Sequence, residues 1–147
     1  MKICVGSDHR GFRIKSKLIA GAESLGHDVQ DMGAFTEQSV DYPDFASQVC
    51  QAVSSGNADR GILVCGTGMG MTIAANKFTG IRAANCYDEV MAEMCRRQLD
   101  VNVLCLPGDL IGDRPVNDLL SVWLSTEFEE GRHTRRVEKV NAFEGQK

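Results

Sequence analysis

The sequence predicts one α/β domain in which helices cover both faces of a five-stranded parallel sheet, a doubly wound arrangement. Short apolar runs alternate with helical patterns along the chain, which is the pattern of this class. The clearest run, residues 61–65, is apolar throughout and therefore fits a strand covered on both faces. A length of 147 residues suits a single core of ordinary size.

The first expected strand, residues 3–5, ends at the turn Gly6-Ser7-Asp8. A helix over residues 12–25 follows, because its apolar residues recur every three to four positions and share one face. Those apolar residues are Ile14, Leu18, Ala22 and Leu25. Gly26 suits the left-handed position that commonly follows a helix. Residues 27–30 are expected to form a weak second strand.

The middle of the chain predicts a loop over residues 35–43 and a helix over residues 44–54. After the apolar strand at 61–65, a helix is expected at residues 71–77 and a strand at residues 81–86.

The remaining elements begin with a helix at residues 87–98 and a strand at residues 101–106. Asp113-Arg114-Pro115 is expected to open a helix that extends to Glu129, because proline favours the first helical turn. A last helix is expected at about residues 134–143.

Composition and charge exclude several classes of protein. The formal net charge of −4 gives no general attraction to nucleic acids or anionic lipids. Every apolar stretch falls short of the roughly 20 residues that span a bilayer. The N-terminus has too few apolar residues for a signal-peptide core. We therefore expect a cytoplasmic protein without a nucleic-acid or membrane partner.

The six cysteines are expected to be buried free thiols. Cys4, Cys65 and Cys105 lie in the apolar runs that predict strands. No two cysteines have C-x-x-C spacing, and no Cys/His cluster has the spacing of zinc ligands. We expect neither a metal nor another cofactor.

The strongest local motif is the loop Cys65-Gly66-Thr67-Gly68-Met69-Gly70 between a strand and a helix. Its alternate glycines expose backbone N–H groups, and the helix adds its positive N-terminal end. The loop could hold a phosphate or a developing oxyanion. Met71 breaks the dinucleotide-binding fingerprint, and the Gly-Lys-Ser/Thr of a P-loop is absent. A tight turn that only permits close packing remains the alternative.

Cys65 ends its strand beside these amides, where partial positive charge would favour the thiolate. It could therefore act as a base, although an ordinary core thiol is the alternative.

Polar residues follow other strands at the same open edge of the sheet, where ligands bind in such folds. Asp8 and His9 end the first strand, and Asn85-Cys86-Tyr87 end the fourth. His9 could bind an anion or transfer a proton, and Asp8 could orient it or a sugar hydroxyl. The alternative is that Ser7 or Asp8 caps the helix.

Two further segments are candidates for ligand contacts. Tyr42 could donate a hydrogen bond to a ligand, or its ring could simply pack at a helix start. Arg132 and Arg136 are four residues apart and share one helix face, where paired guanidinium groups suit a phosphate. The alternative for these arginines is a solvated surface.

Together these residues resemble the family of ribose-5-phosphate isomerase B and the galactose-6-phosphate isomerase subunits. The motifs that carry the resemblance are GSDH-x-GF at 6–12, DYPDFA at 41–46, GILVCGTGMGM at 61–71, AANKFTGIRAA at 74–84 and EGRH-x-x-R at 130–136. They extend over almost the whole chain.

The resemblance implies a Rossmann-like domain that forms homodimers or homotetramers, with each site shared between subunits and the last helix packed on a partner. It also implies that Cys65 removes the C2 proton of an open-chain aldose and that an ene-diol forms. Thr67 and the loop amides would hold the oxyanion. The residues implied in substrate binding are His9, Arg132 and Arg136 for the phosphate, and Asp8 and Tyr42 for the sugar.

Three positions depart from the family pattern. Gln98 and Leu99 stand where ribose-phosphate isomerases usually have a His-Asn pair that contacts the sugar and assists ring opening. Asp109 stands where the family usually has an arginine beside the phosphate site. The reversed charge should weaken phosphate binding unless another group compensates.

We therefore expect an aldose–ketose isomerase of a sugar phosphate, with the sugar left open. A tetrose phosphate, which has no ring to open, would suit the loss of the His-Asn pair. An isomerase of an unphosphorylated or acidic sugar and a non-catalytic partner subunit are the alternatives.

Overall fold

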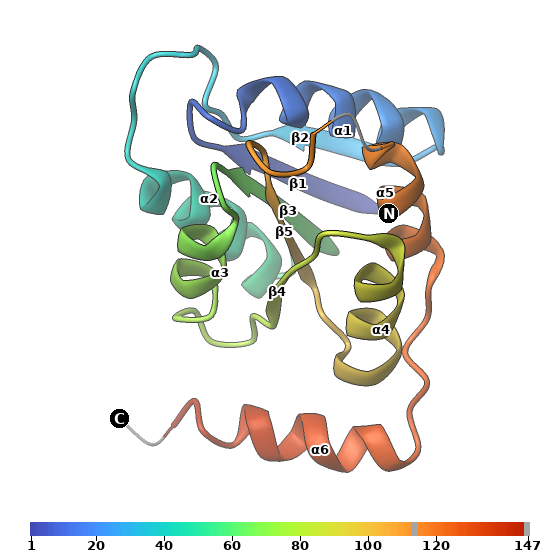
Figure 1. The fold of residues 1–147 in the computed structure, drawn as a ribbon. Helices are drawn as coiled ribbons and strands as arrows, with labels where there is room; N and C mark the ends of the chain where they lie inside the picture. The colour runs from blue at the N-terminus through green and yellow to red at the C-terminus, as the bar shows by residue number, and fades with distance from the viewer. Residues whose placement is uncertain (113–114, 146–147) are drawn as a thin grey trace.

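The computed structural model describes residues 1–112 and 115–145. Its strands are β1 (Lys2–Ser7), β2 (Asp28–Asp31), β3 (Arg60–Cys65), β4 (Ala83–Asn85) and β5 (Val103–Pro107). Its helices are α1 (Phe12–Ser24), α2 (Tyr42–Ser54), α3 (Met69–Ala75), α4 (Glu89–Leu99), α5 (Val116–Ser125) and α6 (Arg132–Asn141). Strands and helices alternate as far as α5, as the sequence predicts (Figure 1).

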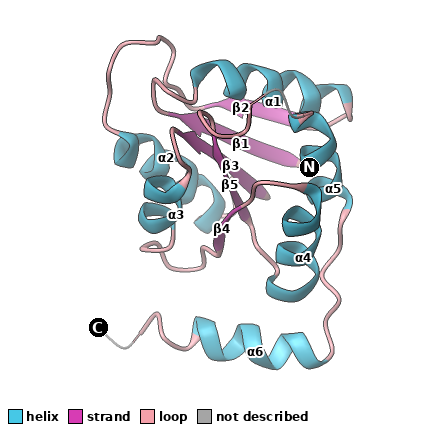
Figure 2. Cartoon of the chain, in the orientation of Figure 1, coloured by secondary structure: helices cyan, strands magenta, loops and turns pink. Residues whose placement is uncertain are grey.

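The strands form one parallel sheet in the order β2-β1-β3-β5-β4 (Figure 2). β3 lies in the centre, with Ile62 opposite Val5 of β1 and Leu104 of β5. The predicted five-stranded parallel sheet is therefore confirmed. Because the chain passes from β2 across β1 to β3, the strand order reverses between β1 and β3, which is where such sheets usually bind ligands.

Alternate residues of β3 face the two helix layers, as the period of a strand requires. Ile62 and Val64 belong to a core with side chains of α1, α4 and α5. Leu63 and Cys65 belong to a second core with side chains of α2 and α3. The predicted helices on both faces are confirmed, and the sulfur of Cys65 lies on the α2–α3 side.

Two helices, α2 and α3, begin two residues earlier than the sequence patterns predict. α2 begins at Tyr42 rather than at residue 44, since Pro43 fits the first helical turn. α3 begins at Met69 rather than at residue 71, because Gly68 takes a left-handed conformation (φ 75°) that turns the chain directly into the helix.

The last two helices also differ in their bounds. α5 covers Val116–Ser125 and ends before the predicted Glu129, and α6 covers Arg132–Asn141 rather than residues 134–143. The predicted start of the fifth helix at Asp113-Arg114 lies outside the described residues. α6 is reached by an extended segment and lies apart from the sheet, below α4 and β4 in Figure 1.

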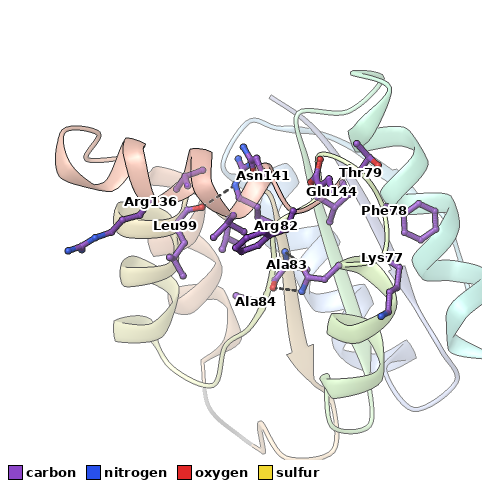
Figure 3. Close-up of a pocket in the computed structure, with 16 residues that line it drawn as sticks. Lys77, Phe78, Thr79, Arg82, Ala83, Ala84, Leu99, Arg136, Asn141 and Glu144 are labelled. Atoms are coloured by element: carbon purple, nitrogen blue, oxygen red, sulfur yellow. Dashed lines mark hydrogen bonds between the residues drawn. The ribbon is translucent and has the colours of Figure 1, made fainter. Parts of the chain in front are cut away.

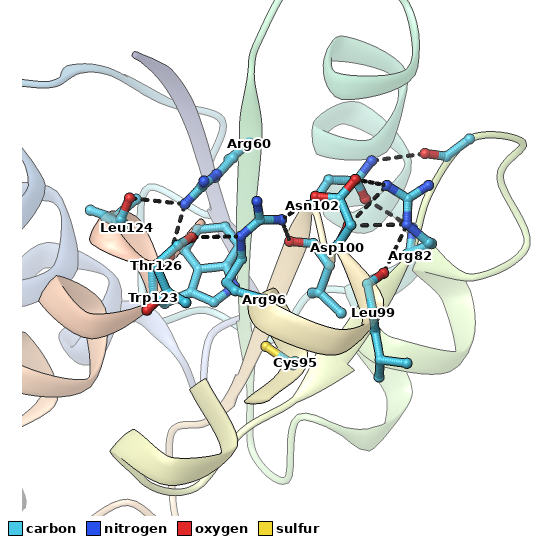
Figure 4. Close-up of polar contacts among 12 residues, drawn as sticks. Arg60, Arg82, Cys95, Arg96, Leu99, Asp100, Asn102, Trp123, Leu124 and Thr126 are labelled. Carbon is cyan, nitrogen blue, oxygen red and sulfur yellow. Dashed lines mark hydrogen bonds and ion pairs between the residues drawn. The ribbon is translucent and has the colours of Figure 1, made fainter. Parts of the chain in front are cut away.

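Buried arginines tie the C-terminal ends of α4 and α5 together (Figure 4). Arg60 donates to the carbonyl oxygens of Trp123 and Leu124 at 2.8 and 3.0 Å. Arg96 donates to the carbonyl of Val101 at 2.6 Å and to Asp100 Oδ1 at 2.9 Å. The contacts of Arg60 satisfy two carbonyl groups that α5 leaves unpaired at its end.

All six cysteines are buried free thiols, as predicted. Among the residues that the structure describes, no helix is long and apolar enough to cross a membrane.

Candidate active site

The ends of β1, β3 and β5 meet at one edge of the sheet through main-chain hydrogen bonds. The amide of Asp8 donates to the carbonyl of Val64 at 3.1 Å. The amides of Gly108 and Asp109 donate to the carbonyls of Cys65 and Gly66 at 2.8 and 3.0 Å. The segments that follow the three strands are therefore fixed relative to one another.

Glycines allow this close approach. A Cβ atom on Gly11 would lie 2.5 Å from the carbonyl oxygen of Val64, and one on Gly108 would lie 3.0 Å from the carbonyl oxygen of Arg10. Any larger residue at Gly11 would push the chain after β1 away from β3.

Cys65 lies at the end of β3, with 5% of its surface exposed. The amide of Gly68 donates to its Sγ at 3.2 Å. This hydrogen bond strengthens as negative charge develops on the sulfur. The left-handed conformation of Gly68 turns its N–H back toward the strand end. The glycine-rich loop therefore supplies a hydrogen-bond donor to the thiol.

A second loop amide also has a partner inside the loop, because Met69 N donates to Thr67 Oγ1 at 3.3 Å. An oxyanion would therefore rely on the other amides of the loop and of the first turn of α3, which have no partner within the helix. The Thr67 side chain lies on the exposed side of the loop.

Asn85, which the sequence places at the end of β4 without a defined role, contacts this loop. Its Nδ2 donates to the Thr67 carbonyl at 2.9 Å and to the Tyr87 hydroxyl at 3.0 Å. Its Oδ1 is buried without a hydrogen-bond partner and packs against Gly68. The sequence indicated this contact only through the position of Asn85 at a strand end, because the carboxyl ends of parallel strands lie at the same edge of a sheet.

Asp8 acts within its own turn. It is buried, and its Oδ1 accepts from the amides of Arg10 and Gly11 at 2.9 and 3.0 Å. These two bonds fix the turn that leads into α1. They are not the helix cap that the sequence leaves open as an alternative, because the N-cap of α1 is Gly11 and no side chain caps it.

His9 and Tyr42 approach the same edge of the sheet. His9 Nδ1 accepts from the amide of Val40 at 3.3 Å, so the proton of the neutral ring lies on Nε2. The Tyr42 ring packs over the loop, since a Cβ atom on Gly70 would lie 2.9 Å from Tyr42 Cζ. Tyr42 remains 38% exposed.

Arg10 and Asp109 form an ion pair over Gly66, so the residue with reversed charge has a cationic partner. Arg10 follows β1 and Asp109 follows β5, on the two sides of β3. The sequence motifs gave no signal for this contact.

The other predicted residues lie elsewhere in the chain, on α4 and α6. Leu99 is half exposed and lines a groove with Arg136 of α6, as Figure 3 shows. Gln98 Nε2 contacts Met94 Sδ at 3.4 Å, and Arg132 Nε donates to His133 Nε2 at 3.4 Å.

The groove has a volume of about 570 Å³ and separates α6 from the segments around β4. Its lining includes apolar side chains of Ile81, Val137, Val140 and Phe143. None of the loop residues 65–70 lines it. Within one chain, the predicted site residues therefore form two separate groups.

Within residues 1–112 and 115–145, no group of three or more His, Cys, Asp or Glu side chains is arranged to hold a metal ion.

The sequence model of a family described as "Ribose/Galactose Isomerase" matches residues 3–140. The chain is 43% identical to ribose-5-phosphate isomerase B of Escherichia coli, over 97% of this chain and 96% of that protein. It is 35% identical to a D-erythrulose-4-phosphate isomerase of Pectobacterium atrosepticum, over 99% and 97%. The solved structure of Clostridium thermocellum ribose-5-phosphate isomerase B superposes with a TM-score of 0.97 and 45% identity, covering 99% of both chains.

Proposed function

The chain belongs to the ribose/galactose isomerase family and is an aldose–ketose isomerase of a sugar phosphate, and we propose that Cys65 is its catalytic base. The family resemblance of the motifs is thereby confirmed. The observation that supports Cys65 is the hydrogen bond from the amide of Gly68 to its Sγ, at the edge of the sheet where the strand order reverses.

In the proposed reaction, the Cys65 thiolate removes the proton from C2 of an open-chain aldose. The electron pair of the broken C2–H bond forms a C1–C2 double bond, and the carbonyl oxygen becomes an oxyanion. A proton on that oxygen gives the ene-diol. Loss of the C2 hydroxyl proton and return of the Cys65 proton to C1 then give the ketose.

The loop would supply the donors for the oxyanion. The amides of Gly68 and Met69 already donate to Cys65 Sγ and Thr67 Oγ1, so the proposed donors are Thr67 Oγ1 and the amides of Gly66 and Gly70. These groups belong to a loop that is ordered before substrate arrives, so they need little reorganisation as charge develops. Asn85 holds the Thr67 carbonyl and keeps this geometry. Tyr42 covers the loop, and His9 would bind the phosphate through its Nε2–H.

We also propose that the complete site forms between two copies of the chain. Arg132, Arg136, Gln98 and Leu99 lie on α4 and α6, away from Cys65 in the same chain. The large apolar side chains exposed on and beside α3, α4 and α6 include Met69, Ile73, Val90, Met94, Leu99, Val140 and Phe143. Such a patch marks an interaction surface, and a two-fold partner would bring the second group opposite the first.

The sugar is either ribose 5-phosphate or a tetrose phosphate. The first is supported by the name of the Escherichia coli relative. The second is supported by Leu99, whose side chain offers no hydrogen bond to a ring oxygen, and by the name of the Pectobacterium relative. A cytoplasmic location would suit the buried free thiols, which persist in a reducing compartment.

Proton NMR in deuterated water tests the proposal across sugar phosphates of three to six carbons. The wild-type enzyme should exchange the C2 proton of at least one of them. Cys65→Ala should slow that exchange by about 10³-fold or more, because it removes the group proposed to take the proton.

Cys4→Ala is the matched control, because Cys4 is buried in the same core layer as Cys65 but lies away from the loop. It should retain exchange within about threefold of wild type. Full exchange in Cys65→Ala would eliminate Cys65 as the base.

A further inference from the structure

Arg10 and Asp109 bring two charges to the residue that follows Cys65. A Cβ atom on Gly66 would lie 2.8 Å from Arg10 Cζ and 2.8 Å from Asp109 Oδ2. Both side chains therefore rest on the first glycine of the loop. The ion pair therefore lies at the residue next to Cys65 in the chain.

Main-chain contacts hold the pair in place. The amide of Arg10 donates to Asp8 Oδ1 at 2.9 Å, and the amide of Asp109 donates to the Gly66 carbonyl at 3.0 Å. The backbone of Arg10 is thus held by Asp8, and its guanidinium is held by Asp109. A group fixed in this way loses little freedom when a ligand binds.

Arg10 also has donors left for a ligand. Its side chain is 57% exposed, against 35% for Asp109. A guanidinium carries more N–H donors than one carboxylate can accept, so it can bind Asp109 and a phosphate together. An exposed ion pair contributes little to the free energy of folding, so stability alone does not account for this pair.

We propose that Arg10 binds the phosphate of the substrate and that Asp109 positions Arg10 for this contact. The assignment rests on the proposed function, because it requires a phosphorylated substrate at the Cys65 loop. Under this proposal Asp109 increases the affinity for the phosphate, although its own charge repels the phosphate. A carboxylate that only repelled the phosphate would weaken binding, whereas one that orients Arg10 strengthens it.

The test uses the full-length enzyme and the sugar phosphate whose C2 proton the wild type exchanges fastest. Arg10→Ala should raise the KM about 10- to 100-fold, the effect of losing a charge-assisted hydrogen bond, with kcat within about threefold. Calorimetric titration should show the same weakening in Kd. Arg10→Lys should recover part of the affinity, because it keeps the charge but not the planar donor pair.

Arg13→Ala is the matched control. Arg13 lies one turn further along, is 83% exposed, and pairs with Glu37 at 2.7 Å. It should leave KM within about twofold of wild type, as expected when a surface ion pair is removed.

Asp109→Asn decides the role of the carboxylate. It should raise KM about 3- to 10-fold, and Arg10→Ala with Asp109→Asn should be no weaker than Arg10→Ala alone, because the second change acts through the first. A lower KM in Asp109→Asn would overturn the positioning role.

An unchanged KM in Arg10→Ala, with an active wild type, would overturn the role of Arg10 and leave the isomerase proposal intact. A wild-type enzyme that exchanges no sugar phosphate would instead remove the proposed function, and this assignment with it.

Discussion

Cys65 differs from the other core cysteines in what surrounds its sulfur. Burial raises the pKa of the Cys50 and Cys105 thiols to about 12, whereas Cys65 Sγ accepts a hydrogen bond from the amide of Gly68. All three are buried. The difference arises because Cys65 ends its strand, where the chain turns and can present an N–H group to the sulfur.

Alkylation should reveal this difference. At pH 8, a thiol with a pKa of about 12 is ionised in only about one molecule in ten thousand. Iodoacetamide should therefore leave Cys50 and Cys105 intact. It should modify Cys65, the proposed base at the strand end, as measured by peptide mass spectrometry. A bound sugar phosphate should protect Cys65. Modification of Cys50 before Cys65 would contradict the assignment.

The same pKa shifts predict how stability depends on pH. The unfolded chain releases thiol protons near pH 9, below the folded value of about 12 for Cys50. The stabilising contribution is therefore complete below pH 9 and is lost as the pH rises toward 12.

For individual residues, the sequence predicted the loop at 65–70 better than it predicted the side chains that contact this loop. Cys65, Thr67 and the glycines were identifiable from their motif. The Arg10–Asp109 pair was not, because residues 10 and 109 meet only once β1 and β5 flank β3. Asp8 was open to two interpretations. Its contacts with two amides fix the turn before α1, whereas the N-cap of that helix is Gly11.

Among the elements, α4 owes its position to charged groups at its C-terminal end. Asp100 ends the helix in a left-handed conformation (φ 47°) and accepts from Arg82 and Arg96. Arg96 is only 5% exposed and also donates to the Thr126 carbonyl at 3.3 Å after α5. The helical period gave α4 and α5 but not this link, since it depends on side chains from three segments.

Arg96→Ala should lower the free energy of unfolding by about 3 kcal/mol, because it leaves the buried carbonyl of Val101 without this donor and Asp100 with Arg82 as its remaining cationic partner. Denaturant unfolding followed by circular dichroism measures the change. Arg97→Ala is the control, since Arg97 is the next residue on α4 but is 41% exposed and pairs with Glu93 and Glu129. It should cost at most about 1 kcal/mol. Equal losses would show that the buried contacts add nothing.

For the whole molecule, the residues predicted for the site lie in two separate groups, which the proposal treats as halves of one site. The Cys65 loop lies at the edge of the sheet, while Arg136 lies on α6, beside the groove of Figure 3. The parallel sheet and the order of strands and helices along the chain were predictable from the sequence. A strand that is buried on both faces is apolar throughout, and such strands alternate with helical patterns. The separation of the two groups was expected only from the family resemblance, since no local pattern in the sequence shows which helix lies away from the sheet.

Mixing two inactive variants tests whether the halves belong to different copies. Cys65→Ala and Arg136→Ala should each lose most of their activity. Refolded together in equal amounts, they should recover about one quarter of wild-type activity, because half of the dimers carry one intact site. Each variant refolded alone is the control. No recovery, with mixed dimers demonstrated by native mass spectrometry, would place both residues in one chain's site.

The glycine contacts of Gly11, Gly66 and Gly108 have an evolutionary consequence. They make the floor of the site from backbone, so its shape does not depend on which side chains surround it. Exchanges at Arg10, Tyr42 or Asp109 could then alter sugar preference while the thiol and its amides keep their places. Laboratory selection for new substrates should accordingly collect its changes on this rim and spare the three glycines.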